Sequence, residues 1–129
     1  MPLENDAVAA RVHRYLELVE TGTADEVAAL FASEATIEDP VGSEVRAGRH
    51  DIREFYATFE SMTKTTRLIS LRACAGQAAF QFEISTEVAE ATFATMSPME
   101  VMVFDDDGLI ESMRAWWAPD DLTIGPAGD

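Results

Sequence analysis

This 129-residue chain has almost no cysteine and few basic residues for its acidic content. Cys74 is its only cysteine, so no disulfide within the chain and no thiolate metal cluster can form. Lysine and arginine together number 9, against 24 aspartate and glutamate residues, which gives a net charge of −15. Nucleic acids and anionic membranes are polyanions that require a basic surface, so neither is an expected partner.

Long apolar runs are also missing. No stretch is long enough to span a bilayer, and the start MPLENDAVAA lacks the basic and apolar regions of a signal peptide, so we expect a cytoplasmic protein. The length fits one domain over residues 1–129, and an apolar content of 47% supports a real core. Residues 119–129 are rich in Asp, Gly and Pro and predict a loosely ordered tail.

The residues that usually bind metals or phosphates form no recognisable site. His13 and His50 are far apart in the sequence, are predicted to lie at the surface, and make a poor metal site. The stretch DDDG at 105–108 indicates a hairpin turn, and there is no GxSxG, GxGxxG or phosphate-binding glycine loop. Cys74 lies in a strand pattern without a nearby base and is predicted to be a small buried hydrophobic residue. We therefore expect no metal and no cofactor.

Helical periodicity comes first in the chain, and strand alternation follows. A capping-box pattern of Thr23 and Glu26 opens the second of three predicted helices. The predicted helices cover 4–21, 23–31 and 48–62, and the predicted strands cover 35–39, 65–75, 77–88, 99–104 and 109–117. This order predicts an α+β fold, with three N-terminal helices packed on one side of a strongly curved antiparallel sheet.

The strand at 99–104, MEVMVF, is apolar on both faces. Half-exposed antiparallel strands usually carry one polar face, so both faces of this strand need a cover. Helices would cover one face, and the sheet of a second copy would cover the other, which predicts a homodimer. Glu100 is the exception in this strand, because it places one carboxyl among Met and Phe side chains.

The segment IEDPVGSE at 37–44 raises the question of whether one of its two adjacent carboxylates, Glu38 or Asp39, is catalytic. Pro40 restricts Asp39 to extended conformations, which places Asp39 at the end of a strand, in either an ordinary turn or a functional position. The only two tyrosines, Tyr15 and Tyr56, lie on the apolar stripes of helices, where they could be plain core residues. Alternatively, two phenols and two carboxyls meet in one apolar pocket, with Glu100 kept protonated by desolvation and Asp39 ionised as a base.

Three blocks of the sequence carry a specific resemblance. ALFASEATIEDPVGSEVRAG at 29–48, IREFYA at 52–57 and SMRAWW at 112–117 resemble the ketosteroid isomerases, which are steroid Δ5-isomerases of the nuclear-transport-factor-2-like superfamily. The resemblance extends from the first helix to about Trp117. It implies that the curved sheet forms a cone-shaped cavity. A carboxylic acid kept neutral in an apolar site is already well known in that family.

The resemblance also implies roles for individual residues. The general base of the family corresponds to Asp39, the oxyanion-hole tyrosine to Tyr15, and the tyrosine that donates to that phenol to Tyr56. The protonated acid of the oxyanion hole is an aspartate in the family, whereas this chain has Glu100, which is longer by one methylene. Glu38 is expected to face away from Asp39, because adjacent strand residues point in opposite directions.

An apolar substrate pocket follows from the same resemblance. A pocket aromatic of the family corresponds to Trp117, with Trp116 beside it, and we also assign Met102 and Phe82 to the lining. The implied substrate is a neutral 3-oxo-Δ5-steroid, converted to its conjugated 3-oxo-Δ4 isomer without metal or cofactor.

Two alternatives stay open from the sequence. The protein could be a non-catalytic or differently specialised member of the superfamily, which binds a lipophilic molecule or a protein partner in the same cavity. It could also be a polyketide cyclase or epoxide hydrolase of similar fold, which would use carboxylates on another substrate.

Overall fold

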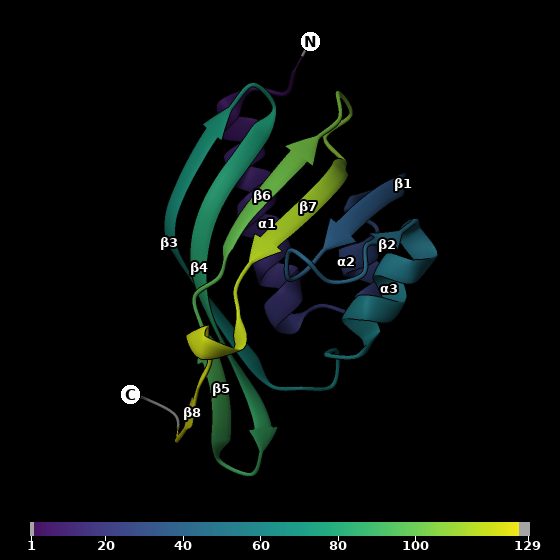
Figure 1. Cartoon of the computed structure of the whole chain (residues 1–129). Helices are drawn as coiled ribbons and strands as arrows, with labels where there is room; N and C mark the ends of the chain where they lie inside the picture. Colours follow the sequence, from purple (N-terminus) through teal and green to yellow (C-terminus); the bar gives the residue numbers. More distant parts are fainter. Residues whose placement is uncertain (1, 127–129) are drawn as a thin grey trace.

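The computed structural model describes residues 2–126 and consists, over that range, of three α-helices packed on one curved sheet (Figure 1). The helices are α1 (Asn5–Thr21), α2 (Ala24–Ala28) and α3 (Arg49–Ala57). The strands are β1 (Phe31–Glu38), β2 (Arg46–Ala47), β3 (Lys64–Cys74), β4 (Gln77–Ala89), β5 (Thr92–Met96), β6 (Met99–Phe104), β7 (Ile110–Trp116) and β8 (Thr123–Gly125), with a 3-10 turn at Pro119–Asp121. The predicted α+β fold with three N-terminal helices is confirmed.

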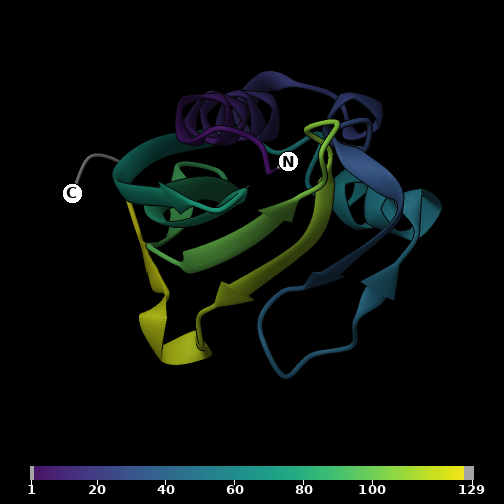
Figure 2. The ribbon, with the colours of Figure 1, turned by 90° about the horizontal axis from the view of Figure 1, so that it is seen from above.

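The strands follow the order β2-β1-β7-β6-β4-β5-β8, with β3 paired to the long β4. The sheet is mixed, so the expectation of a purely antiparallel sheet was wrong in one place. Strand β1 runs parallel to β7, with Ile37 opposite Met113 and Glu38 opposite Arg114. Between β1 and β7 the chain passes through α3 and five other strands, and such a long connection permits parallel pairing where a tight hairpin would not. The sheet curves but does not close (Figure 2).

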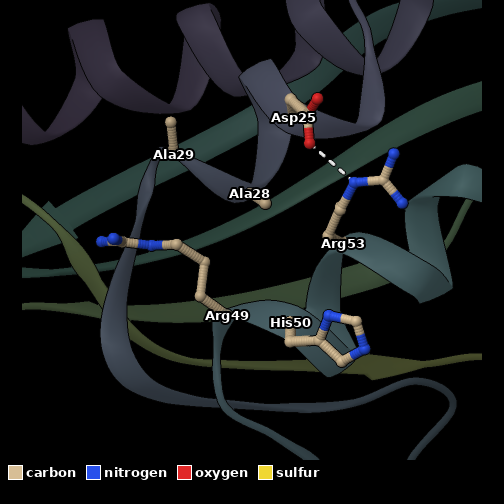
Figure 3. A pocket seen from close by; sticks show the side chains of 6 residues that line it. All are labelled: Asp25, Ala28, Ala29, Arg49, His50 and Arg53. Carbon is tan, nitrogen blue, oxygen red and sulfur yellow. Dashed lines mark hydrogen bonds and ion pairs between the residues drawn. The ribbon is translucent and has the colours of Figure 1, made fainter.

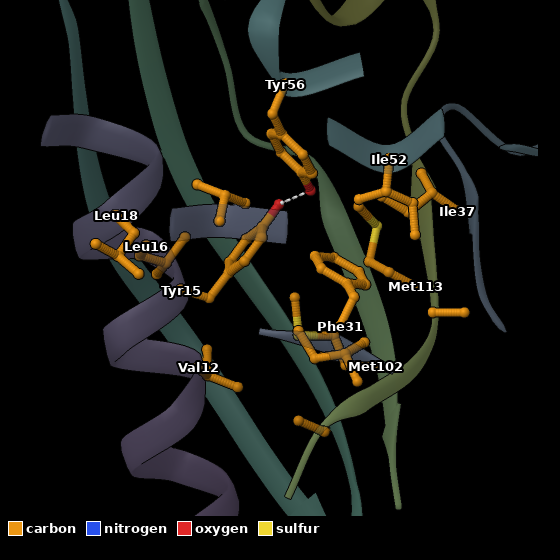
Figure 4. Close-up of a cluster of buried hydrophobic side chains, with 14 of the residues drawn as sticks. Val12, Tyr15, Leu16, Leu18, Phe31, Ile37, Ile52, Tyr56, Met102 and Met113 are labelled. Atoms are coloured by element: carbon orange, nitrogen blue, oxygen red, sulfur yellow. Dashed lines mark hydrogen bonds between the residues drawn. The ribbon is translucent and has the colours of Figure 1, made fainter. Parts of the chain in front are cut away.

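The core lies between the helices and the concave face of the sheet. On α1, Val8, Val12 and Leu16 recur every four residues, so one stripe of the helix is buried against the strands. The predicted capping box of Thr23 and Glu26 is present at the start of α2. Each fully buried Phe, Ile or Met contributes about 1.5–3 kcal/mol to folding. The largest fully buried side chains are Phe31, Ile37, Ile52, Met102, Ile110, Met113, Val8 and Val12. Figure 4 labels all of these except Ile110 and Val8.

Several boundaries differ from the sequence expectation for physical reasons. Helix α2 ends at Ala28 because Phe31 is needed as the first, fully buried residue of β1. Helix α3 ends at Ala57, which leaves Phe59 36% exposed. Cys74 is exposed rather than buried. A β-bulge between Leu68 and Ser70 shifts the alternation of β3, so Cys74 points outward.

The segment from Pro119, expected to be a loosely ordered tail, contains the 3-10 turn and β8, which pairs with β5. Residues 127–129 of that tail lie outside the described residues. Neither β5 nor β8 was expected from the sequence. No helix among residues 2–126 is long and apolar enough to cross a membrane.

Strand β6 shows the alternation that positions the site. Glu100, Met102 and Phe104 are buried on the concave face, under the helices. On the opposite face, Met99 is 58% exposed and Val101 is half-buried. Within a single chain, therefore, only one of the two apolar faces of this strand is covered.

Candidate active site

Two buried phenols meet between α1 and α3. The hydroxyl oxygens of Tyr15 and Tyr56 are 2.7 Å apart, and their rings meet edge to face (Figure 4). Phe31 from β1 contacts both rings, which fixes their orientation. The hydrogen bond between the two hydroxyls uses only one of their two protons. If Tyr56 donates to Tyr15, the proton of Tyr15 is left to bond a third group.

Burial raises the pKa of both phenols well above the ordinary value for tyrosine, and the nearby carboxyl of Glu100 acts in the same direction. The charge of Asp39 acts in the same direction on both. Tyr15 and Tyr56 are therefore neutral and able to donate across the whole physiological pH range. This is the state that an oxyanion-binding phenol requires.

Glu100 places a carboxyl deep in the apolar interior. The residue is 3% exposed, and its Oε1 has no hydrogen-bond partner among residues 2–126. Burial raises the pKa of Glu100 well above its ordinary value, and the nearby charge of Asp39 adds to that effect. The side chain is thus held as a neutral acid, which can donate an O–H bond. An unpaired buried polar atom costs free energy in the folded protein, so its retention favours a functional role.

Asp39 occupies a different environment, immediately after β1 and only half-buried. Its Oδ1 accepts a hydrogen bond of 2.7 Å from Nε1 of Trp117. Burial raises the pKa of Asp39, while the bond from Trp117 and the positive charge of Arg46 oppose that rise. Both opposing influences stabilise the carboxylate. Two carboxyls in unlike environments, one kept neutral and one stabilised as an anion, suit an acid and a base.

Hydrogen bonds to β7 hold the chain both before and after Asp39. The backbone N–H of Val41 donates to the carbonyl of Ala115 at 2.8 Å. Glu38 points away from Asp39, as expected, and its Oε1 accepts a 3.0 Å bond from Nε of Arg114. The other oxygen of Glu38 accepts from the N–H of Gly42 at 2.9 Å. These bonds fix the backbone on either side of Asp39 and so restrict where its carboxylate can lie.

The structure therefore brings together the four titratable residues singled out in the sequence, from α1, α3, β6 and the end of β1. Their proximity is reflected in the pKa values of Tyr15, Tyr56 and Glu100, each of which the charge of Asp39 raises. A proton acceptor and two neutral donors in one apolar cluster can remove a proton from carbon and hold the resulting oxyanion.

The predicted pocket residues divide between the two faces of the sheet. Met102 and Phe82 are buried on the concave face, and Trp117 is held near it by the bond to Asp39. Trp116 is not brought to the cluster, because adjacent strand residues alternate. It is 42% exposed on the outer face, under the guanidinium of Arg114.

Arg46 also acts on the site but was missed in the sequence. Its guanidinium carbon lies 4.8 Å from the ring centroid of Phe55 and its charge acts on Asp39. Only the pairing of β1 with β2 places Arg46 near Asp39. The sequence gives no sign of this pairing, because a strand of two residues leaves no periodic pattern.

Two surface hollows of about 350 Å³ each lie away from this cluster. One lies between α2 and α3 and is lined by Asp25, Ala28, Ala29, Arg49, His50 and Arg53 (Figure 3). Its charges are already paired, since Arg53 donates to Asp25 at 2.6 Å and Arg49 to the carbonyl of Phe31. The other lies between α1 and the turn that joins β6 to β7. Among the described residues, no group of three His, Cys, Asp or Glu side chains could hold a metal ion.

Comparisons with known proteins cover nearly the whole chain. Residues 12–113 match the family described as the SnoaL-like domain. A steroid Delta-isomerase of Nocardioides simplex is 45% identical over 120 residues, which span 93% of this chain and 97% of that protein. A solved structure of SalBIII, described as an epoxide hydrolase/cyclase-like enzyme in pyran ring formation of the polyether salinomycin, superposes with a TM-score of 0.84. It is 27% identical and covers 95% of this chain and 98% of its own.

The buried neutral acid predicts a pH-dependent stability. Below the pKa of an unfolded glutamate, 4.5, Glu100 is protonated in both states. As the pH rises above that value, the unfolded chain releases the proton while the folded chain retains it, so the folded protein loses stability. Glu100→Gln does not titrate. We expect it to be more stable than the wild type at about pH 8, with the difference shrinking towards about pH 5.

Urea unfolding of both proteins across this range measures the effect. Glu111→Gln, a change of the same chemistry at an exposed position on β7, is the matched control and should show no comparable trend. A constant difference between Glu100→Gln and the wild type over the range would show that Glu100 is not held protonated by the fold.

Proposed function

The chain belongs to the SnoaL-like domain family, and we propose that the protein is a steroid Δ5-isomerase, which moves the double bond of a 3-oxo-Δ5-steroid into conjugation with the ketone. The resemblance to ketosteroid isomerases found in the sequence motifs is confirmed by the 45% identity to a steroid Delta-isomerase. The observation that carries the proposal is the cluster itself, in which a neutral buried acid without a partner lies near a buried phenol pair and a carboxylate.

In the proposed reaction, Asp39 removes a proton from the carbon between the ketone and the alkene. The electrons move into the ketone, which gives a dienolate. Its negative oxygen accepts hydrogen bonds from Tyr15 and from the protonated Glu100, and Tyr56 donates to Tyr15. Protonated Asp39 then returns the same proton two carbons further on, so the product is an isomer and the enzyme is regenerated.

The environment of each group supports its step. A base must be ionised, and the N–H of Trp117 stabilises the Asp39 carboxylate. Oxyanion donors must be neutral, and burial keeps Tyr15 and Glu100 protonated. Glutamate in place of the family's aspartate retains the same O–H donor on a longer side chain. A neutral, rigid substrate suits an apolar lining that includes Met102 and Phe82.

A second candidate function is favoured by the structural similarity to SalBIII. A cyclase or epoxide hydrolase would use the same acid and base on an epoxide or polyether precursor. The two candidates differ in one measurement. Conjugation of an enone produces a new ultraviolet band with 5-androstene-3,17-dione, whereas a protein specialised for epoxides, or one that only binds a lipophilic ligand, produces none.

The assignment of the base is tested with Asp39→Asn, which preserves shape and removes the proton acceptor. We expect turnover of 5-androstene-3,17-dione to fall at least about 10²-fold, the low end of general base catalysis, while steroid binding survives. Glu34→Gln, at an exposed position on the same strand, is the control and should keep full activity. Near-normal turnover of Asp39→Asn would eliminate this mechanism.

The oxyanion donors are tested by removing them in turn. Tyr15→Phe and Glu100→Ala each delete one donor, and each should lower turnover by about 10²–10³-fold. Glu100→Gln keeps an N–H and should lose noticeably less, and Glu100→Asp restores the family's residue and should be well tolerated. Tyr56→Phe should cost less than Tyr15→Phe, since it acts through the other phenol. Equal rates for Glu100→Ala and the wild type, with circular dichroism unchanged, would reduce Glu100 to a bystander.

We also propose a homodimer in which the outer faces of two sheets meet. On that face, Met99 and Trp116 are opposite each other on β6 and β7 and are 58% and 42% exposed. Light scattering at micromolar concentration should give twice the chain mass of 14.1 kDa. Val101→Glu, on the same face, should give a monomer, and Val88→Glu, on the distant β4–β5 hairpin, should not. A folded wild-type monomer would contradict the proposal.

A further inference from the structure

Arg46 is the one lysine or arginine among residues 2–126 whose side chain has neither a hydrogen bond nor an ion pair. The chain has nine lysines and arginines, and each of the other eight donates a hydrogen bond to a carboxylate or a backbone carbonyl, or forms an ion pair with a carboxylate. In a chain with 24 acidic residues, an arginine without any hydrogen-bond or ion-pair partner is unexpected. Its guanidinium is therefore available to act on groups in its surroundings.

The fold holds Arg46 on the Asp39 side of the cluster. It lies in β2 and pairs with Ile37 in β1, two residues before Asp39. Its guanidinium carbon is 4.8 Å from the ring centroid of Phe55, within the range of a cation–π contact. The Phe55 ring in turn meets Tyr56 edge to face, with centroids 5.0 Å apart. A stacked guanidinium keeps its full charge, because arginine does not lose its proton in proteins.

Among the residues that the structure describes, Arg46 is the cation whose charge acts on Asp39. The titratable groups that face it from α1, α3 and β6 are Tyr15, Tyr56 and Glu100, all kept neutral by burial. The carboxylate of Glu38 points to the opposite face and is paired with Arg114. The charge of Arg46 lowers the pKa of Asp39 and so opposes the effect of burial.

We propose that Arg46 is an electrostatic positioning residue, which keeps Asp39 ionised and ready to accept a proton in the free enzyme. The inference rests on the proposed isomerase function and adds to it a residue that does not touch the reacting atoms. When Asp39 takes the proton, the negative charge moves to the substrate oxygen, away from Arg46. The residue therefore sets the fraction of enzyme that carries a usable base, and its effect is confined to the acidic side of the pH range.

The test is the pH dependence of kcat/KM for 5-androstene-3,17-dione. In Arg46→Gln, the acid limb should move to higher pH. Activity at about pH 5 should fall about three- to tenfold relative to the wild type, and by about pH 8 it should approach the wild-type value. Arg46→Lys keeps the charge and should restore most of the loss. Arg72→Gln, at an exposed site that bonds only to the neighbouring carbonyl of Leu71, is the matched control.

Two outcomes would overturn the proposal. One is an acid limb for Arg46→Gln that coincides with that of the wild type. The other is an equal loss in Arg46→Lys and Arg46→Gln at every pH, which would mean that Arg46 only packs against Phe55. Circular dichroism of each variant confirms that it is folded.

A measurement without turnover separates this inference from the proposed function. The ¹³C chemical shift of the Asp39 carboxyl, followed by NMR, reports its ionisation directly. We expect Asp39 to titrate at higher pH in Arg46→Gln than in the wild type or in Arg72→Gln, even if the steroid is not a substrate. An unchanged Asp39 titration would overturn the role of Arg46, whereas an absent ultraviolet band in the wild type would overturn the isomerase alone.

Discussion

The hydrogen bond between the phenols of Tyr15 and Tyr56 joins α1 to α3 in the interior, and the geometry of the candidate site depends on it. A buried hydroxyl without a partner is costly, so each phenol requires the other. The pair thereby fixes the distance between two helices that otherwise contact different strands. The bond uses only one of the two hydroxyl protons, so the other proton can donate to a third group. The same bond that stabilises the helix arrangement thus supplies a donor for the site.

The charges around this bond are graded by burial. Glu100 and the phenols lie in the interior and are neutral, whereas Asp39 lies half-buried beside an indole N–H and near a guanidinium. One negative charge is therefore tolerated at the rim of the cluster, and a second is excluded from its centre. This gradient allows one carboxyl of the cluster to be a neutral donor and the other to be an ionised base.

The sequence predicted those features that depend on local periodicity. The stripe of α1, the capping box at Thr23 and the burial of Glu100 on β6 all follow from the spacing of apolar residues. The pairing of β1 with β7 could not be predicted, because it depends on contacts between residues far apart in the chain. The exposure of Cys74 depends on a bulge, and that of Trp116 on the face it takes in β7. Arg46 could not be assigned without the register of β2. The roles expected for Asp39 and Tyr15 came from the family resemblance. The structure adds their hydrogen-bond partners, Trp117 for Asp39 and Tyr56 for Tyr15.

The parallel pairing of β1 and β7 has a consequence for synthesis of the protein. Asp39 follows β1, whose only other sheet neighbour is the two-residue β2. Trp117, which donates to Asp39, and Ala115, which accepts from Val41, come near the C-terminal end of the fold. The bond to Trp117 spans 78 residues of sequence. During translation, β1 can pair only with the two-residue β2 until β7 has left the ribosome, and contacts this distant in sequence form late in folding. The hydrogen-bonded environment of the proposed base is therefore completed late in synthesis. A nascent chain that ends before Trp117 lacks the indole N–H that donates to Asp39.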